Sequence, residues 1–204
     1  MSASAVVNPD QNRRILEIIT EISALLVHTN STQELLSRVL EGLQQHFGVH
    51  HAYMLLPIDG DQLQVVAGIG AASAHLGQQI KVGVGIAGVA AQRKRTVSIG
   101  NMKVNRRYMR SLMSSPTGPN NTHTEVNLPG LADADSQMAI PLIVGDQVAV
   151  VLVAESVDAV VFSKEDAEIF ALIASQIAAA VLTAQNQEKL EKMRNEERLS
   201  LIHI

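Results

Sequence analysis

The chain has 204 residues, of which 47% are hydrophobic and 18% are charged, a composition typical of a globular protein with one sizeable core. The formal net charge of −4 and the aromatic content of 2% exclude the basic surface and the base-stacking platform of a nucleic-acid-binding protein. The lack of cysteine excludes disulfides, thiolate nucleophiles, thiolate zinc sites and a chromophore attached through a thioether.

Two segments bear on membranes. Residues 1–14 are polar and lack the apolar core of a signal peptide. The longest unbroken apolar run, residues 148–154, is too short to cross a bilayer. We therefore expect a cytoplasmic protein, without direct membrane contact in this chain.

An N-terminal helix is predicted to begin at Asn8, because Asn caps helices and the following Pro9 fits the first turn. One apolar line along this helix consists of Ile15, Ile18, Ile22 and Leu25, and a second line of Leu16, Ile19 and Leu26. A helix that packs on one core needs one apolar stripe, so the second line indicates a partner helix and a homodimer. The alternative is a helix buried in a larger core. Residues 1–30 are thus expected to be a dimerisation helix.

A second helix is predicted to follow a capping box formed by Ser31 and Glu34. Its single apolar stripe consists of Leu36, Val39, Leu40, Leu43 and Phe47. Gly48 is expected to end this helix, and the single stripe predicts that it covers one face of a sheet.

Strands and turns occupy the middle of the chain. Residues 51–56 and 62–67 flank an Asp-Gly turn and predict a hairpin. After a loop or short helix at 68–79, the pattern predicts an extended segment at 79–82, a helix at 85–94 and a strand at 96–99. A short basic helix is expected at 101–113. Residues 114–135 form a long irregular stretch of the kind that often serves as a lid or binding loop.

A second hairpin is predicted from residues 137–144 and 147–155, whose nearly continuous apolar runs place both strands centrally in the sheet. The last helix is expected to begin at a Ser163 cap. Small residues on this helix permit close approach of another helix, so Ala178 and Val181 are predicted dimer contacts. Beyond Ala184 the apolar stripe thins, and residues 185–204 are expected to form a solvated helical connector to an effector.

Gly83, Gly85 and Gly88 match the G-x-G-x-x-G pattern of dinucleotide-binding proteins. That interpretation requires a βαβ unit and an acidic ribose-binding residue roughly 20 residues further on. Residues 101–108 contain neither Asp nor Glu, and the chain begins with two predicted helices. The pattern is therefore not expected to bind a dinucleotide.

Three motifs together resemble the GAF domain, a sensory module of signalling proteins. The first is Gly85-Ile86-Ala87-Gly88-Val89-Ala90 followed by Thr96-Val97-Ser98-Ile99. The second is Ala139-Ile140-Pro141-Leu142 leading through Gly145-Asp146 to Val150-Val151-Leu152-Val153-Ala154-Glu155-Ser156. The third is Phe162-Ser163-Lys164-Glu165-Asp166 with the small-residue stretch that begins at Ile173. The resemblance covers residues 31–184.

The resemblance implies an α+β fold, with an antiparallel sheet, long terminal helices on one face and a small-molecule pocket on the other. It reinterprets Gly85 and Gly88 as the start and the packing surface of a short pocket helix. We expect a bacterial regulatory domain that acts as a homodimer, in which a ligand orders residues 114–135. The strand at 137–144 would then carry the change to the dimer helices. The alternative is a ligand-free homodimerisation module.

Other functions are less well supported. The cyclic-nucleotide subfamily carries Asn-Lys where this chain has Glu155-Ser156, although Phe162 and Asp166 match its pattern. GAF enzymes that reduce free methionine sulfoxide use cysteines, and this chain has none, so no enzymatic activity is expected. No metal site is expected, because the His46 and His50 pair is interrupted by Gly48 and is better explained as a polar helix–strand junction.

The expected ligand-binding residues are Tyr53, Val97, Ile99, Asn101, Arg106, Arg107, Tyr108, His123, Met138 and Ile140. Arg106 and Arg107 either clamp an anionic group of the ligand or form a solvated basic turn. A haem ligand at His123 is a weaker alternative to a solvent-facing loop histidine. The expected dimer contacts are Ile15, Ile18, Ile22, Leu25, Ala178 and Val181.

Overall fold

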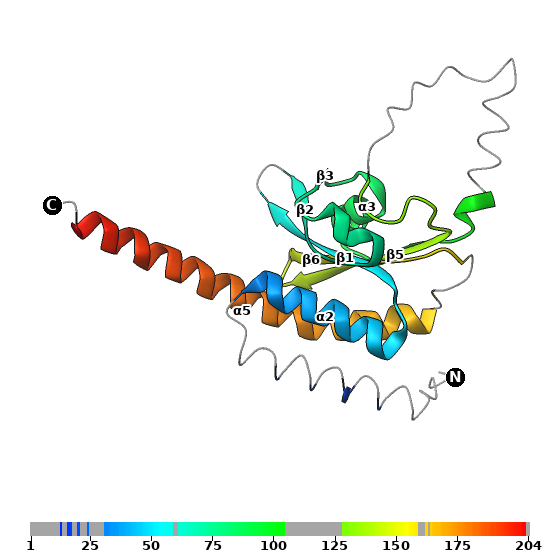
Figure 1. Ribbon diagram of the computed structural model, residues 1–204, viewed down its shortest axis with the longest axis horizontal. Helices are drawn as coiled ribbons and strands as arrows, with labels where there is room; N and C mark the ends of the chain where they lie inside the picture. Colours follow the sequence, from blue (N-terminus) through cyan, green and yellow to red (C-terminus); the bar gives the residue numbers. More distant parts are fainter. Residues whose placement is uncertain are drawn as a thin grey trace, which may run out of the picture.

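The computed structural model describes residues 31–58, 61–104, 128–158, 162 and 164–202, together with positions 13, 16, 17, 20 and 24. Within this part of the chain, six strands form an antiparallel sheet in the order β3-β2-β1-β6-β5-β4 (Figure 1). The strands are β1 (His51–Ile58), β2 (Gln62–Ile69), β3 (Gln79–Lys81), β4 (Val97–Ile99), β5 (Ser136–Val144) and β6 (Gln147–Ser156). The helices are α2 (Thr32–Phe47), the 3-10 helix η1 (Gly70–His75), α3 (Gly85–Arg93) and α5 (Lys164–Ile202). The expected α+β fold is confirmed, and the antiparallel pairing excludes the parallel sheet of a dinucleotide-binding fold.

The sheet separates two layers of helices. Helices α2 and α5 cover one face, which we call the α2/α5 face, while α3 lies over the other, which we call the α3 face (Figure 1). Each face has its own cluster of buried side chains. The central position of β6, between β1 and β5, agrees with its nearly continuous apolar sequence, since both of its faces are covered.

Helix α2 forms as its periodicity predicts. Leu36, Val39, Leu40 and Leu43 are fully buried in the α2/α5-face cluster, and Phe47 packs against them. The helix ends at Gly48, whose backbone N–H donates to the Gln44 carbonyl oxygen at 3.1 Å. The predicted capping box is wrong in one respect, because the Ser31 side chain makes no capping hydrogen bond.

Helix α5 has 39 residues and continues well past the sheet (Figure 1). Its first half packs on β5 and β6, and there Ala178 is 1% exposed and Val181 is 0% exposed. These two side chains belong to the protomer's own core, where α5 packs on the sheet and on α2 of the same chain, so their assignment as dimer contacts is wrong. Among the described residues, no helix combines the length and apolar content needed to cross a bilayer.

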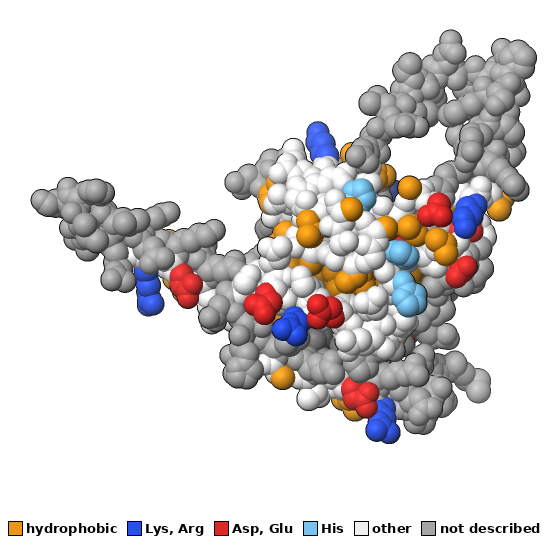
Figure 2. Space-filling model, viewed as in Figure 1, with side chains coloured by type: hydrophobic (Ala, Val, Ile, Leu, Met, Phe, Trp, Pro, Cys, Tyr) orange, Lys and Arg blue, Asp and Glu red, His pale blue; other side chains and the backbone are white. Residues whose placement is uncertain are grey.

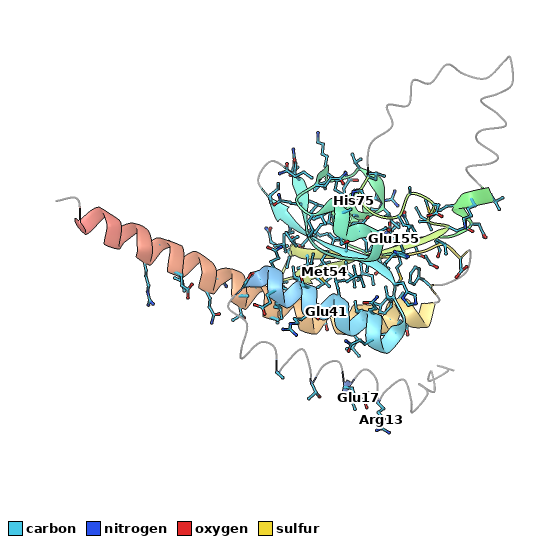
Figure 3. The ribbon with its side chains drawn as sticks, in the orientation of Figure 1. Arg13, Glu17, Glu41, Met54, His75 and Glu155 are labelled. Carbon is cyan, nitrogen blue, oxygen red and sulfur yellow. The ribbon has the colours of Figure 1, made fainter. Side chains whose placement is uncertain are left out.

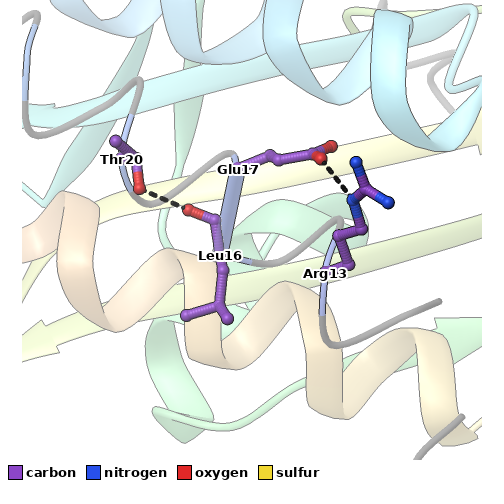
Figure 4. Close-up of polar contacts among 4 residues, drawn as sticks. All are labelled: Arg13, Leu16, Glu17 and Thr20. Atoms are coloured by element: carbon purple, nitrogen blue, oxygen red, sulfur yellow. Dashed lines mark hydrogen bonds and ion pairs between the residues drawn. The ribbon is translucent and has the colours of Figure 1, made fainter. Parts of the chain in front are cut away.

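Near the N-terminus the structure describes a few positions that interact at a spacing of four residues. Arg13 forms an ion pair with Glu17 at 3.1 Å, and the Thr20 hydroxyl donates to the Leu16 carbonyl oxygen at 2.7 Å (Figure 4). All four residues are exposed. The predicted dimer contacts Ile15, Ile18, Ile22 and Leu25 lie outside the described residues and stay predictions.

The glycine-rich segment forms a turn and the short helix α3, as the resemblance implies. A Cβ atom at Gly88 would lie 2.6 Å from the Lys81 carbonyl oxygen, so only glycine lets the helix pack this closely on the turn that precedes it. The Gly83 N–H also donates to the Gly88 carbonyl oxygen at 2.9 Å. These glycines therefore serve backbone packing.

Candidate functional site

Two rows of side chains cross the α3 face on neighbouring strands. The strand registers place Ile99, Gln137, Glu155 and His51 in one row, running from β4 through β5 and β6 to β1. The next row consists of Val97, Ala139, Val153 and Tyr53. Residues two apart on a strand share a face, so these rows lie side by side beneath the elements on the α3 side. Figure 3 shows Glu155 on this side of the sheet and Met54 on the other.

Glu155 is the ionisable group at the centre of the first row, and it is only 3% exposed. Its Oε2 atom accepts a hydrogen bond from the Leu131 backbone N–H at 2.6 Å, and its Oε1 atom accepts one from the Gln137 side-chain amide at 2.7 Å. Burial raises the pKa of Glu155 to about 7, although both hydrogen bonds act in the opposite direction. The site therefore holds a carboxyl group that gains or loses its proton near neutral pH.

A short segment, residues 128–131, lies over Glu155, and we call it the strap. Gly130 has φ 109°, and a Cβ atom there would lie 2.3 and 2.5 Å from the two carboxylate oxygens of Glu155. At the other end of the strap, Leu128 packs against Gly85, where a Cβ would lie 2.9 Å from the leucine side chain. The strap thus runs from the start of α3 to the centre of the sheet.

Tyr53 lies in the second row, in the buried cluster of the α3 face. Burial raises the pKa of its hydroxyl, and the nearby charge of Glu155 raises it further. Tyr53 therefore stays neutral at physiological pH and offers a hydroxyl that both donates and accepts hydrogen bonds.

His51 ends the first row and has a structural partner. Its Nδ1 atom accepts a hydrogen bond from the Ala71 N–H at 3.2 Å, and this bond anchors η1 to the sheet. Among the described residues, no group of three or more His, Cys, Asp or Glu side chains is arranged to hold a metal ion. The hydrogen bond from Ala71 gives His51 a structural role at the start of β1.

The structure brings only some of the predicted site residues together. Tyr53, Val97 and Ile99 share the α3 face, and Asn101 is exposed beyond the end of β4. Met138 and Ile140 point to the α2/α5 face and belong to its core, so they do not line a site with Tyr53. Arg106, Arg107, Tyr108 and His123 lie outside the described residues, and their roles stay predictions.

Sequence reasoning missed Glu155 and Gln137, which supply the polar groups of the first row. A signal was present, because Glu155 directly follows the apolar run 148–154 and is two residues from Val153. A charged residue at such a position of a central strand points into a covered face, where an unsatisfied charge is costly.

A groove of about 190 Å³ lies at the adjoining ends of β1 and β6, and Glu155 and His51 are among the residues that line it. Its walls also include Phe47, Phe162 and Phe170. The Phe170 ring meets those of Phe47 and Phe162 edge to face, with centroid distances of 5.6 and 6.4 Å. This volume falls below the range usual for small-molecule sites. Figure 2 shows hydrophobic side chains along the middle of the viewed face and scattered single charges around them. Because this groove is small, we place the candidate site on the α3 face, around Glu155 and Tyr53.

Comparison with known proteins gives the family. The family model described as GAF domain matches residues 29–181. A search of curated proteins by sequence found no match. The solved structures that resemble the chain include the GAF domain of an Acinetobacter phosphoenolpyruvate-protein phosphotransferase, with 17% identity over 88% of this chain and 97% of that chain, and a TM-score of 0.69.

Two further structures resemble the chain. The GAF domain of a Coxiella burnetii phosphoenolpyruvate-protein phosphotransferase is 16% identical over 89% of this chain and 99% of that chain, with a TM-score of 0.66. Free methionine-R-sulfoxide reductase from Neisseria meningitidis, solved with its substrate, is 18% identical over 91% of this chain and 99% of that chain, with a TM-score of 0.64. At these identities the likeness concerns the fold, whereas the family model covers most of the chain. The chain belongs to the GAF family of domains, which often bind small molecules.

Proposed function

We propose that this chain is a regulatory sensory domain that binds a small molecule on its α3 face and passes the signal through α5 to an effector. The observation that carries the proposal is the buried carboxyl group of Glu155, set among apolar side chains beneath the strap. Strongly perturbed carboxyl groups occur preferentially at functional sites. A cytoplasmic location is part of the same proposal.

The polar groups of the α3 face indicate which chemical groups a ligand would carry. Glu155 and the Tyr53 hydroxyl favour a ligand with hydrogen-bond donors. In its charged form, which prevails above pH 7, the buried Glu155 carboxylate disfavours a phosphate group next to it, because like charges repel strongly away from water. This argues against the cyclic-nucleotide alternative, in addition to the missing Asn-Lys pair.

A melting screen tests ligand binding. A ligand that binds only the folded chain at a concentration of 100 times its Kd stabilises it by about 2.7 kcal/mol and raises the melting temperature by several degrees. We expect at least one polar metabolite in a broad screen to produce this shift. The shift should shrink in Tyr53→Phe and Glu155→Gln and persist in Glu41→Gln, whose side chain is exposed on α2 (Figure 3). Native mass spectrometry of the purified protein would provide an independent search for a retained ligand.

Two results would count against this proposal. If no compound raises the melting temperature, the ligand-free dimerisation module becomes the better account. If a compound binds Glu155→Gln and Tyr53→Phe as tightly as the unaltered chain, its site lies away from the α3 face.

We also propose that the chain has no catalytic activity of its own. The GAF reductases that it resembles use cysteines, and this chain contains none. Incubation with free methionine-R-sulfoxide and excess dithiothreitol should therefore yield no methionine above the rate without protein.

The proposed signal route requires a homodimer, and the exposed side of α5 supports one. Among the side chains of this helix that the structure describes, the exposed large hydrophobic ones are Leu172, Leu182, Leu190 and Met193. Leu182→Glu combined with Leu190→Glu should convert a dimer to a folded monomer in light scattering. Leu76→Glu, an exposed leucine far from α5 in sequence, should leave the mass unchanged. An unchanged dimer in the double variant would place the interface elsewhere.

A further inference from the structure

The strap is held at three points. Leu128 rests on Gly85 at the start of α3, Gly130 lies against the carboxyl group of Glu155, and the Leu131 N–H donates to Glu155 Oε2 at 2.6 Å. Leu128 is 42% exposed, and its apolar contact is not directional. The hydrogen bond to Glu155 is therefore the main directional contact between the strap and the sheet.

The same carboxyl group experiences two opposing effects. The N–H of Leu131 and the amide of Gln137 favour the charged form through hydrogen bonds. Burial disfavours the charged form, and this effect is the larger one. No positive charge offsets it among the groups that influence the Glu155 carboxyl in the described part of the chain. Because Glu155 is only 3% exposed beneath the strap, movement of the strap would return water to a charged carboxyl group.

We propose that the strap is a proton-operated latch, which stays closed over the α3 face while Glu155 carries a proton and opens when Glu155 loses it. The proposal concerns the chain without ligand and does not depend on the proposed function. Its consequence is that access to the α3 face is regulated by pH.

The direction of the pH dependence follows from the difference in the pKa of Glu155 between the closed and the open strap. With the strap closed, burial raises the pKa of Glu155 to about 7, and with the strap open the solvated carboxyl group regains its ordinary value of 4.5. The closed state therefore binds the proton more tightly, so its advantage is full below pH 4.5 and is lost as the pH rises through 7. Between pH 5 and pH 8 the equilibrium constant for opening should rise by roughly tenfold to a hundredfold.

The position of the proton is constrained by the hydrogen bonds. Because Leu131 donates to Oε2, a proton on that oxygen would face another donor. The proton therefore resides on Oε1, and the Gln137 amide turns so that its carbonyl oxygen accepts. The closed strap thus keeps its backbone hydrogen bond when Glu155 is neutral.

Other ionisable groups surround this latch. His51 and Tyr53 face Glu155 from β1, and the Tyr53 hydroxyl stays neutral. Asp135, just after the strap, accepts the backbone N–H of Lys103 at 2.6 Å, while the Lys103 ammonium donates to the Val157 carbonyl oxygen at 2.6 Å. Asp133 and Asp158 are exposed. Of the acidic residues named here, only Glu155 has its carboxyl group buried under the strap.

Amide hydrogen exchange by NMR tests the latch on the ligand-free chain. The protection factor of the Leu131 amide corrects for the intrinsic pH dependence of exchange, so it reports opening alone. Between pH 5 and pH 8 this factor should fall by tenfold or more in the unaltered chain. It should be nearly constant in Glu155→Gln, which keeps the shape of the side chain but cannot ionise.

Two controls separate the latch from global unfolding. The Gly48 amide, bonded to Gln44 at the end of α2, should show a much smaller change over the same pH range. Glu41→Gln should behave like the unaltered chain. A parallel decline at Leu131 and Gly48, or the same decline at Leu131 in Glu155→Gln, would overturn the proposal.

A second test, an NMR titration, uses only the unaltered chain and needs no variant. The carboxyl carbon resonance of Glu155 should titrate with a pKa near 7 in the unaltered chain. A midpoint below pH 5 would also overturn the proposal, because the closed strap would then bind the proton no better than water does.

Discussion

Gly130 and Glu155 show how tightly one backbone position and one side chain depend on each other. A φ of 109° is strained for any residue with a Cβ, and the Cβ would also meet the carboxylate oxygens. The contact is therefore possible only with glycine at this position. It brings the strap close enough for the Leu131 N–H to reach the carboxyl group.

Gly130→Ala should lower the free energy of unfolding by about 2 to 4 kcal/mol in urea denaturation, through backbone strain and the clash with Glu155. Gly77→Ala is the matched control, because Gly77 also has positive φ, 83°, but nothing lies near its missing Cβ. It should cost only about 1 to 2 kcal/mol.

A double-mutant cycle identifies the partner in this clash. In a Glu155→Ala background, the cost of Gly130→Ala should fall toward that of Gly77→Ala. Equal costs of Gly130→Ala in both backgrounds would show that the carboxyl group does not obstruct the new methyl group.

At the scale of elements, α2 and α5 together cover one face of the sheet, but with different kinds of side chain. Helix α2 contributes a stripe of buried leucines, whereas α5 contributes mainly small and branched residues in its first half and leaves the sheet in its second. In that second half, Leu190 is 58% exposed and Met193 is 51% exposed. Equivalent substitutions in these two helices should therefore differ in cost.

Leu40→Ala in α2 should destabilise the chain by about 2 to 5 kcal/mol, because it leaves a cavity in the core. Leu190→Ala should cost less than about 1 kcal/mol in a dilute, monomeric sample. Urea denaturation at low and high protein concentration provides the measurement. If Leu190→Ala destabilises the chain only at high concentration, α5 contacts a second copy there.

The sequence predicted most of these elements, because apolar periodicity and turn residues determine them locally. It was less informative about which face a side chain meets. The run from Ala139 to Val144 is nearly continuous in apolar residues, so no alternation distinguishes its two faces, and Met138 and Ile140 were assigned to the wrong one. Ala178 and Val181 were misassigned for a similar reason, since a small residue suits a sheet as well as a helix. Glu155 was missed because its role depends on Gly130 and Leu131, which meet it only in the fold.

At the scale of the whole molecule, the α3 face and the α2/α5 face share the strands β1, β5 and β6. Glu155 on the α3 face is the neighbour of Ala154 in β6, and the Ala154 side chain is buried against the helices on the opposite face. This arrangement supports the proposed route from the α3 face to α5. Such a route operates only if the ligand binds the two arrangements of α5 with different affinity.

Paired spin labels on α5 of the dimer, at positions 186 and 194, test this coupling. A ligand found in the melting screen should change the distance distribution between the two copies. The change should be lost in Glu155→Gln at ligand concentrations that still saturate the protein. An unaltered distribution with bound ligand would mean that the site and the helix are not coupled.

The order of the strands also has a consequence for how the chain is made. Strand β1 pairs with β6, and in that pairing His51 lies opposite Glu155, 104 positions later (155 − 51). During synthesis, the edge of β1 that pairs with β6 therefore stays unpaired until residues 147–156 have left the ribosome. Non-local pairing of this kind slows folding and leaves an unfinished sheet available to other chains. We expect a fragment ending at residue 104 to aggregate or bind chaperones, and the intact protein to refold over milliseconds to seconds rather than microseconds.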